Sequence, residues 1–488
     1  MFMPLVKNQQ IPLTVTGMSA EGAGIGRIGD HRFLCGENND PENFIACDNT
    51  VSGMVVFVPG TAVGDRISCH ILRVEKSHAY GKIAELLEPS ADRLPDEAIG
   101  CDVFGKCGGC VFRHVTYEAE LRYKQQRVAD ALTRIGGLDV SGLIQPIVGS
   151  SQADGYRNKA MYPVRAGKYR LMAGFFAPNS HRLIEQHHCA LQPPEFGDIV
   201  GAIVKWGKLA GVTGYDEETQ TGLLRHIYLR RASTGGDGKY GGIMVCLVCT
   251  SGKLPQTKLL IELLTARVPA VCSVRVNINR ADTNVVLGDS GFLLWGEEAL
   301  TDELCGLRFR LSPDSFYQVN HGQAERLYRL TGEAAQLKKT DTLLDLYCGT
   351  GTIGLSLAGQ VKRLIGVESV PAAVEDARKN AVNNNIDNAR FICADAAEAA
   401  KQLPAEGIRP DVVIVDPPRK GCSPETLEAV AAMAPRRLVY VSCNPATLAR
   451  DVALIRPHGY TVIQVTPVDM FPRTAHVECV AGLQRKDA

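Results

Sequence analysis

The chain contains 488 residues, which is more than one hydrophobic core usually supports, so its length predicts two or three domains. Hydrophobic residues form 45% of the sequence and charged residues 22%, and no apolar run is long enough to cross a bilayer, which excludes a membrane-spanning helix. Lysine plus arginine equals aspartate plus glutamate, at 53 each, so the chain lacks the overall basic bias that nucleic-acid-binding proteins often carry. A local basic patch is nevertheless enough to bind RNA phosphates.

The N-terminus lacks the charged start and apolar core of a secretory signal, so we expect a cytoplasmic protein without membrane contact. Disulfides are rarely maintained in that compartment. The 16 cysteines therefore point to metal binding or catalysis for some of them.

Short β-type runs alternate with glycine-rich turns between about residues 10 and 89. The runs cover 11–15, 54–58, 66–74 and 81–87. Such spacing predicts a small β-barrel. Residues 35–49 are polar and predict a long surface loop inserted in that barrel.

Different patterns follow the barrel. Cys101, Cys107 and Cys110 lie in one short segment, and residues 117–135 have the apolar spacing of an amphipathic helix. Residues from about 150 to 315 alternate in strand fashion, with few long helical patterns. They predict a β-rich middle domain.

After Tyr328 the pattern becomes apolar strand, turn and helix, repeated. Five strands are expected, at 342–346, 364–368, 390–393, 412–416 and 438–442. This alternation is typical of a doubly wound parallel sheet.

Acidic residues and glycines cluster where these strands end. Gly349-x-Gly351-x-x-Gly354 forms a turn through which the backbone can approach a ligand, and it also matches the dinucleotide fingerprint of dehydrogenases. Glu368 is placed to accept hydrogen bonds from ribose hydroxyls, and Asp395 to meet an adenine amino group. Asp416 is followed by two prolines, a rigid wall that favours a methyltransferase acting on a planar nitrogen or carbon centre.

One cysteine and one acidic residue carry the expected chemistry. C5 of uracil attacks a methylsulfonium only after a thiolate has added to C6, and a base must then remove the C5 proton. Cys443 follows the fifth strand and is the candidate nucleophile. Glu478 lies in the last strand-like run and is the candidate base, although His476 competes for that role.

Four motifs in order resemble the RNA uracil-5-methyltransferase family: Asp-Leu-Tyr-Cys-Gly-Thr-Gly from Asp345, Asp-Pro-Pro-Arg-Lys-Gly from Asp416, Ser-Cys-Asn-Pro around Cys443, and His-Val-Glu ending at Glu478. The resemblance covers nearly the whole chain. It implies Cys443 as nucleophile and Glu478 as proton acceptor. It also implies contacts with S-adenosyl-L-methionine from Gln318, Tyr347, Thr352, Glu368, Asp395 and Asp416.

The cysteine segment supplies three soft ligands, and Cys189 is the candidate fourth. Spacing alone leaves zinc and an iron–sulfur cluster open. The ribosomal-RNA branch of the family carries a [4Fe-4S] cluster with this pattern, so the resemblance implies that Cys101, Cys107, Cys110 and Cys189 hold one. That branch also has a TRAM barrel, similar to residues 15–87, which implies 23S ribosomal RNA as the substrate. Archaeal transfer-RNA enzymes of similar layout keep transfer RNA as an alternative.

The expected fold class is α/β: a C-terminal doubly wound, Rossmann-like methyltransferase domain, an N-terminal TRAM/OB-like β-barrel and a β-rich middle domain. We expect the barrel at 10–89, the middle domain with its cluster at 90–111 and 148–315, and the methyltransferase domain at 112–147 and 316–488. Two other function classes remain open, a nicotinamide-dependent oxidoreductase and a non-catalytic RNA-binding iron–sulfur protein.

Overall fold

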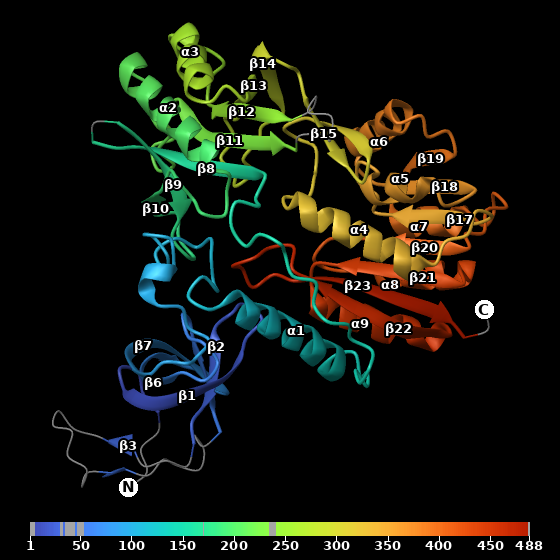
Figure 1. Ribbon diagram of the computed structural model, residues 1–488, viewed down its shortest axis with the longest axis horizontal. Coiled ribbons are helices and arrows are strands. Elements are labelled where there is room, and N and C mark those ends of the chain that lie inside the picture. Colours follow the sequence, from blue (N-terminus) through green and yellow to red (C-terminus); the bar gives the residue numbers. More distant parts are fainter. Residues whose placement is uncertain are drawn as a thin grey trace. The chain divides into compact units, whose positions relative to one another are not determined.

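The computed structural model describes residues 5–29, 33–34, 44–45, 53–168, 170–233 and 241–486 (Figure 1). These residues form two compact units. Unit 1 comprises 1–105, 109–128 and 473–475, and unit 2 comprises 106–108, 129–472 and 476–488. None of the described helices is long and apolar enough to cross a membrane. Most of the predicted 35–49 insertion lies outside the described residues, so its loop character stays a prediction.

Unit 1 contains the predicted barrel, which is closed. Its strands hydrogen-bond in the order β1 (Gln10–Met18), β2 (Gly24–Arg27), β5 (Val55–Val58), β7 (His78–Glu88) and β6 (Arg66–Val74). Buried and exposed residues alternate along these strands, as a barrel with one packed face requires. A two-stranded pair, β3 (Phe33–Leu34) with β4 (Phe44–Ile45), belongs to the same unit.

The first sheet of unit 2 has seven strands. In spatial order they are β10 (Leu183–Glu185), β9 (Leu171–Phe176), β8 (Lys159–Ala166), β11 (Leu224–Ala232), β12 (Gly242–Cys249), β13 (Val271–Ile278) and β14 (Ser290–Gly296). Helices α2 (Pro194–Ala210) and α3 (Thr257–Arg267) pack against each other over one face of this sheet (Figure 1). Residues 194–210 thus form a helix inside a segment where the sequence indicates mainly strands. A hairpin, β15 (Leu300–Leu304) with β16 (Leu307–Leu311), follows.

The second sheet of unit 2 is the predicted doubly wound sheet. Its order is β19 (Ala389–Cys393), β18 (Arg363–Glu368), β17 (Thr342–Leu346), β20 (Val412–Val415), β21 (Arg437–Ser442), β23 (Glu478–Arg485) and β22 (Tyr460–Val468). The first five strands are parallel, and β23 is antiparallel to both of its neighbours. The α/β fold class and the N-terminal barrel expected from the sequence are confirmed.

Helices cover both faces of this sheet. Helices α4 (His321–Ala335), α5 (Thr352–Ala358) and α6 (Pro371–Asn383) share one hydrophobic core with residues from its strands. Helices α7 (Ala396–Gln402), α8 (Pro424–Met433) and α9 (Pro445–Ile455) form a second contiguous row. Strands buried on both faces must be apolar throughout, which explains why all four residues of β20 are buried aliphatic side chains.

One long helix, α1 (Tyr117–Arg134), begins in unit 1 and ends in unit 2. The apolar spacing of the sequence predicts it at 117–135. The boundary between the two units passes through α1 at Val128. The expected division into three domains remains a prediction.

Candidate active site

The glycine turn follows β17 at the carboxyl edge of the sheet, where the candidate site lies. Tyr347, Gly349 and Gly351 have φ angles of +63°, +55° and +82°. Glycine adopts this left-handed region without strain, whereas Tyr347 is a costly exception of the kind that clusters at functional sites. A Cβ atom at Gly354 would lie 2.7 Å from Oδ2 of Asp345, so only glycine fits there.

Asp345 is a buried acid beneath this turn that the sequence reasoning did not single out. Its Oδ2 accepts a hydrogen bond from the Gly354 amide at 3.0 Å, while its buried Oδ1 has no hydrogen-bond partner among the described residues. Burial, reinforced by the negative charge of Asp416, raises the pKa of the Asp345 carboxyl to about 8. An acid inside an otherwise apolar strand was the signal that could have identified it.

Glu368 ends β18, the strand beside β17, and its carboxylate faces the turn. Oε2 accepts from the Gly349 amide at 3.1 Å, and Oε1 accepts from the Val370 amide at 2.9 Å. Oε1 also accepts from the Ser369 hydroxyl at 3.1 Å, so these bonds fix the carboxylate and leave the second lone pair of Oε2 for a ligand hydroxyl. The arrangement fits an adenosine ribose at this edge.

The other predicted cofactor residues lie around the same sheet. Thr352 begins α5, and its hydroxyl is 2.9 Å from the Tyr328 hydroxyl. Asp395 is exposed and caps α7, where its Oδ1 accepts from the Ala397 amide at 2.8 Å. Gln318 lies just before α4, and its carbonyl accepts from Nδ2 of Asn158 at 3.0 Å. The side chain of Asp395 therefore has a structural role as a helix cap, whether or not it also meets a ligand.

Asp416 follows β20, and the segment after it is tied to α9. Asp451 is fully buried, and its Oδ2 accepts from the Cys422 amide at 2.8 Å and from the Tyr440 hydroxyl at 2.6 Å. Arg450 forms an ion pair with Asp451 at 2.6 Å and donates to the Lys420 carbonyl at 2.9 Å. Sequence reasoning missed Asp451, because nothing in its local pattern reveals contacts this far along the chain.

Strand register brings the two predicted chemical residues together. Ser442, the last residue of β21, pairs with Cys479 of the antiparallel β23. Cys443 directly follows β21, and Glu478 is the first residue of β23, so the two residues lie at the same end of the ladder. Glu478 is 5% exposed, whereas Cys443 is only partly buried and sits immediately before the Asn444 cap of α9.

Electrostatics tie Cys443, Glu478 and Asp416 into one group. Burial raises the pKa of the Cys443 thiol to about 11, and the charges of Glu478 and Asp416 contribute to the rise while Arg419 opposes it. Burial and then Asp416 raise the pKa of Glu478 to about 8. Burial also raises the pKa of Asp416 to about 7. A carboxyl that titrates near neutrality can exchange a proton during a reaction at physiological pH.

Arg419, His476 and Arg473 are polar residues near these motifs in the sequence, and they differ in their contacts. An Arg419 guanidinium nitrogen lies 3.4 Å from Nε2 of His476, and the His476 ring meets Phe471 edge to face at 6.1 Å. Arg473, which belongs to unit 1, is held there by Glu120 and by the Val115 carbonyl. The Arg473 guanidinium is therefore already bound by neighbouring residues of unit 1.

The four candidate metal ligands are divided between the units. Cys101 and Cys110 belong to unit 1, and Cys107 and Cys189 belong to unit 2. Within the described part of the chain, no three or more histidine, cysteine, aspartate or glutamate side chains are grouped so that they could hold a metal ion. The cluster therefore stays a prediction from the sequence.

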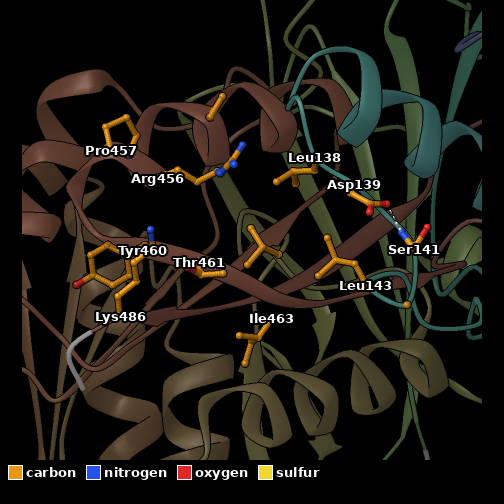
Figure 2. A pocket seen from close by; sticks show the side chains of 13 residues that line it. Leu138, Asp139, Ser141, Leu143, Arg456, Pro457, Tyr460, Thr461, Ile463 and Lys486 are labelled. Carbon is orange, nitrogen blue, oxygen red and sulfur yellow. Dashed lines mark hydrogen bonds between the residues drawn. The ribbon is translucent and has the colours of Figure 1, made fainter.

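A pocket of about 810 Å³ lies away from these residues, at the opposite edge of the doubly wound sheet (Figure 2). Tyr460 begins β22 and lines it together with Arg456 and with Leu138 and Asp139. Tyr460 pairs with Arg485 at the far end of β23 from Glu478. Among the described residues that line this pocket, none is a predicted catalytic or cofactor residue.

Comparison with known proteins identifies similar sequences along the chain. The family described as tRNA (Uracil-5-)-methyltransferase matches residues 294–486, which include every predicted catalytic and cofactor residue. The TRAM domain family matches residues 5–84, which include most of the barrel.

Whole-chain relatives agree with these matches. A protein of Clostridium tetani named as an uncharacterized RNA methyltransferase is 40% identical over 98% of this chain and 97% of its own length. One of Halalkalibacterium halodurans with the same description is 39% identical over 99% of both chains. The crystal structure of Pyrococcus abyssi tRNA (uracil-54, C5)-methyltransferase in complex with S-adenosyl-L-homocysteine is 26% identical, covers 96% of this chain and 99% of its own, and superposes with a TM-score of 0.72.

Proposed function

Because the chain belongs to the RNA uracil-5-methyltransferase family and carries a TRAM domain, we propose that it methylates C5 of a specific uridine in RNA through Cys443 and Glu478. The observation that carries this proposal is the β21–β23 register, which sets Cys443 and Glu478 at one end of the same ladder. That end is also the edge at which the glycine turn follows β17.

Each residue has a defined part in the proposed reaction. The Cys443 thiolate adds to C6 of the uracil ring, and the electrons of the C5–C6 double bond move toward the C4 carbonyl, which makes C5 nucleophilic. S-adenosylmethionine, when bound, supplies the methyl group that C5 accepts. Glu478 then takes the C5 proton, the double bond forms again, and the carbon–sulfur bond breaks to return the thiolate.

The residues present fit an adenosine-type methyl donor. The carboxylate of Glu368 is held at the ribose position, and the left-handed turn at Gly349 and Gly351 lets a ligand approach the backbone closely. We propose that Gln318, Tyr347, Thr352, Glu368, Asp395 and Asp416 bind S-adenosylmethionine.

For the RNA we propose 23S ribosomal RNA, on the basis of the barrel and the cysteine spacing. Transfer RNA is the second candidate, because a transfer-RNA enzyme shares the fold over 96% of this chain. In either RNA the target uridine must leave its folded structure and enter the site. Sequencing of methylated uridines in cells that lack this protein distinguishes the two, because the missing mark lies in one RNA or the other.

We further propose that Cys101, Cys107, Cys110 and Cys189 hold a [4Fe-4S] cluster. This proposal rests on their spacing and on the resemblance to the ribosomal-RNA enzymes. Iron and sulfide analysis of anaerobically purified protein tests it. About four of each per chain support the cluster, and stoichiometric zinc without iron contradicts it. The cytoplasmic location is likewise retained as a proposal.

The central test uses RNA that contains 5-fluorouridine at the target. Fluorine cannot leave as a proton, so with S-adenosylmethionine the wild-type protein should form a stable covalent complex with this RNA. Cys443→Ala should form none. Cys393→Ala is the matched control, because Cys393 is exposed at the carboxyl end of β19 in the same sheet, and it should react like wild type.

The base is tested with ordinary RNA. Glu478→Gln keeps the size of the side chain but cannot take the C5 proton, so it should accumulate a methylated covalent complex that wild type resolves. A Glu478→Gln variant that turns over at the wild-type rate would assign the proton to another group, with His476 the next candidate.

A further inference from the structure

Three aromatic rings gather on the outer face of the unit 1 barrel. Phe57 comes from β5, and His78 and Tyr80 come from the parallel neighbour β7. The Phe57 and Tyr80 ring centroids are 5.7 Å apart, and His78 lies edge-on to both rings, at 5.6 Å from Phe57 and 5.1 Å from Tyr80. We call Phe57, His78 and Tyr80 the aromatic trio.

Strand alternation explains why the trio faces outward. Val56, Val58 and Ala79 are fully buried in the barrel core, so the residues between them point to the other face. Register places Phe57 directly opposite Tyr80. Tyr80 is 42% exposed, so its ring remains accessible although two other rings lie beside it.

Hydrogen bonds fix the orientation of the rings. Nε2 of His78 lies 3.2 Å from the Tyr80 hydroxyl, and Nδ1 of His78 lies 3.2 Å from the Ser77 hydroxyl. The Tyr80 ring is therefore held in place before any ligand binds. Such preorganisation lowers the entropic cost of binding a flat partner.

Cationic side chains flank the trio on β7 itself and on two neighbouring strands. Arg73 of β6 pairs with Tyr80, and Lys82 follows two residues after Tyr80 on the same face of β7. Arg27 of β2 pairs with Val55, on the other side of β5. All three are exposed, although Arg73 also forms an ion pair with Glu75 and Arg27 donates a hydrogen bond to the Gly53 carbonyl at 3.0 Å.

We propose that the aromatic trio is a stacking platform for unpaired RNA bases, with Arg27, Arg73 and Lys82 contacting the adjoining phosphates. An exposed, fixed aromatic surface bordered by cations is the chemistry by which barrels bind single-stranded nucleic acid without reading its sequence. The choice of RNA as ligand rests on the proposed function. The choice of this face rests on the geometry of unit 1.

A local fluorescence probe tests the platform in the full-length protein. The chain's two tryptophans, Trp206 and Trp295, both lie in unit 2, so Tyr80→Trp adds a reporter to the barrel. A 20-nucleotide unstructured oligoribonucleotide, added without methyl donor, should quench the Tyr80→Trp emission beyond the change seen in wild type. Leu87→Trp is the matched control on β7, because Leu87 is 45% exposed, and its emission should not be quenched.

Affinity gives a second measure. Tyr80→Ala should weaken binding of the single-stranded oligoribonucleotide roughly tenfold, as expected for the loss of one stacked base, whereas Tyr80→Phe and Leu87→Ala should bind within about twofold of wild type. The same sequence as a duplex should bind wild type and Tyr80→Ala equally, since its bases are not free to stack.

The outcomes separate this inference from the proposed function. No quenching of Tyr80→Trp, or equal losses for Tyr80→Ala and Leu87→Ala, would overturn the stacking platform. If Tyr80→Ala unfolds the barrel, the Tyr80→Trp and Tyr80→Phe results still decide. The binding experiments contain no methyl donor, so their results do not depend on methyl transfer. A failure to form the covalent complex in the 5-fluorouridine test would overturn the proposed function and leave the binding result unchanged.

Discussion

Among single residues, burial and the neighbouring acids together determine how readily the Cys443 thiolate forms. Glu478 and Asp416 both raise the pKa of the Cys443 thiol through their negative charge, in addition to the effect of burial. The positive charge of Arg419 opposes them. Protonation of either acid therefore favours ionisation of the cysteine, which couples the nucleophile and the base electrostatically.

The coupling predicts the reactivity of a Glu478→Gln variant. Removing the Glu478 charge lowers the pKa of Cys443, so at pH 9 iodoacetamide should modify Cys443 roughly threefold faster or more, since one unit changes the thiolate fraction tenfold. Mass spectrometry of the Cys443 peptide measures this rate. The exposed Glu428→Gln on α8 is the control, and equal rates in both variants would contradict the coupling.

The raised pKa of Glu478 also predicts how the stability of the folded protein changes with pH. Its pKa is raised from 4.5 to about 8 in the folded protein, so between these values the folded state binds more protons than the unfolded state. Stability from this group is thus fully present below pH 4.5 and is lost as pH rises through 8.

Glu478→Gln removes that loss. It should be more stable than wild type by ~2 kcal/mol at pH 9, an order-of-magnitude value, with little difference at pH 4.5. Urea unfolding followed by Trp206 and Trp295 reports on unit 2, where Glu478 lies. A larger stabilisation at pH 4.5 than at pH 9 would reverse the sign and refute the argument.

At the scale of elements, the segment after β20 depends on α9 for its position. Asp451 of α9 accepts two hydrogen bonds and pairs with Arg450, which itself binds two carbonyls of the segment. A Cβ at Gly421 would lie 2.5 Å from Oδ2 of Asp451, so the segment packs tightly on the helix. Asp416 starts this segment, and α9 therefore indirectly orients it.

Asp451→Ala should leave a buried amide and a buried hydroxyl without an acceptor, and should cost ~3 kcal/mol of stability. It should also raise the KM for S-adenosylmethionine more than it lowers kcat, because Asp416 loses its support. Urea unfolding and initial-rate kinetics measure the two effects. Glu428→Ala, exposed on α8, should change neither. A stable Asp451→Ala variant with wild-type KM would show that the segment holds its position alone.

On the whole-molecule scale, the two units carry different parts of the proposed function. All residues proposed to bind S-adenosylmethionine belong to unit 2, whereas the barrel and the aromatic trio belong to unit 1. The neutral net charge of the sequence is compatible with this division, because local groups of cations such as those beside the trio are enough for phosphate contacts.

Ligand binding should follow the same division. S-adenosylhomocysteine at about 100 times its Kd should stabilise unit 2 by ~2.7 kcal/mol and slow hydrogen exchange around 347–354 and at Glu368. Exchange in the barrel strands should not change. NAD is the control, and protection by NAD with none from S-adenosylhomocysteine would favour the oxidoreductase alternative.

Local sequence patterns determined the fold class and most strands. Strand periodicity and glycine turns depend on residues close together in the chain, so β6 and β17 were predicted with the bounds that they have. The helix α2 was not foreseen, although its polar residues Glu195, Asp198, Lys205 and Lys208 recur at helical spacing, because strand patterns on both sides dominate this part of the sequence. Local motifs were likewise enough to identify Cys443 and Glu478 as candidates.

Only the tertiary structure decided which of these residues are neighbours. The sequence did not reveal that β23 runs antiparallel beside β21, which brings Glu478 level with Cys443. Nor did it reveal that Asp451 supports the segment after Asp416, or that Phe57 lies opposite Tyr80. Strand pairing and electrostatic coupling arise from contacts between distant parts of the chain, and local propensity carries no information about them.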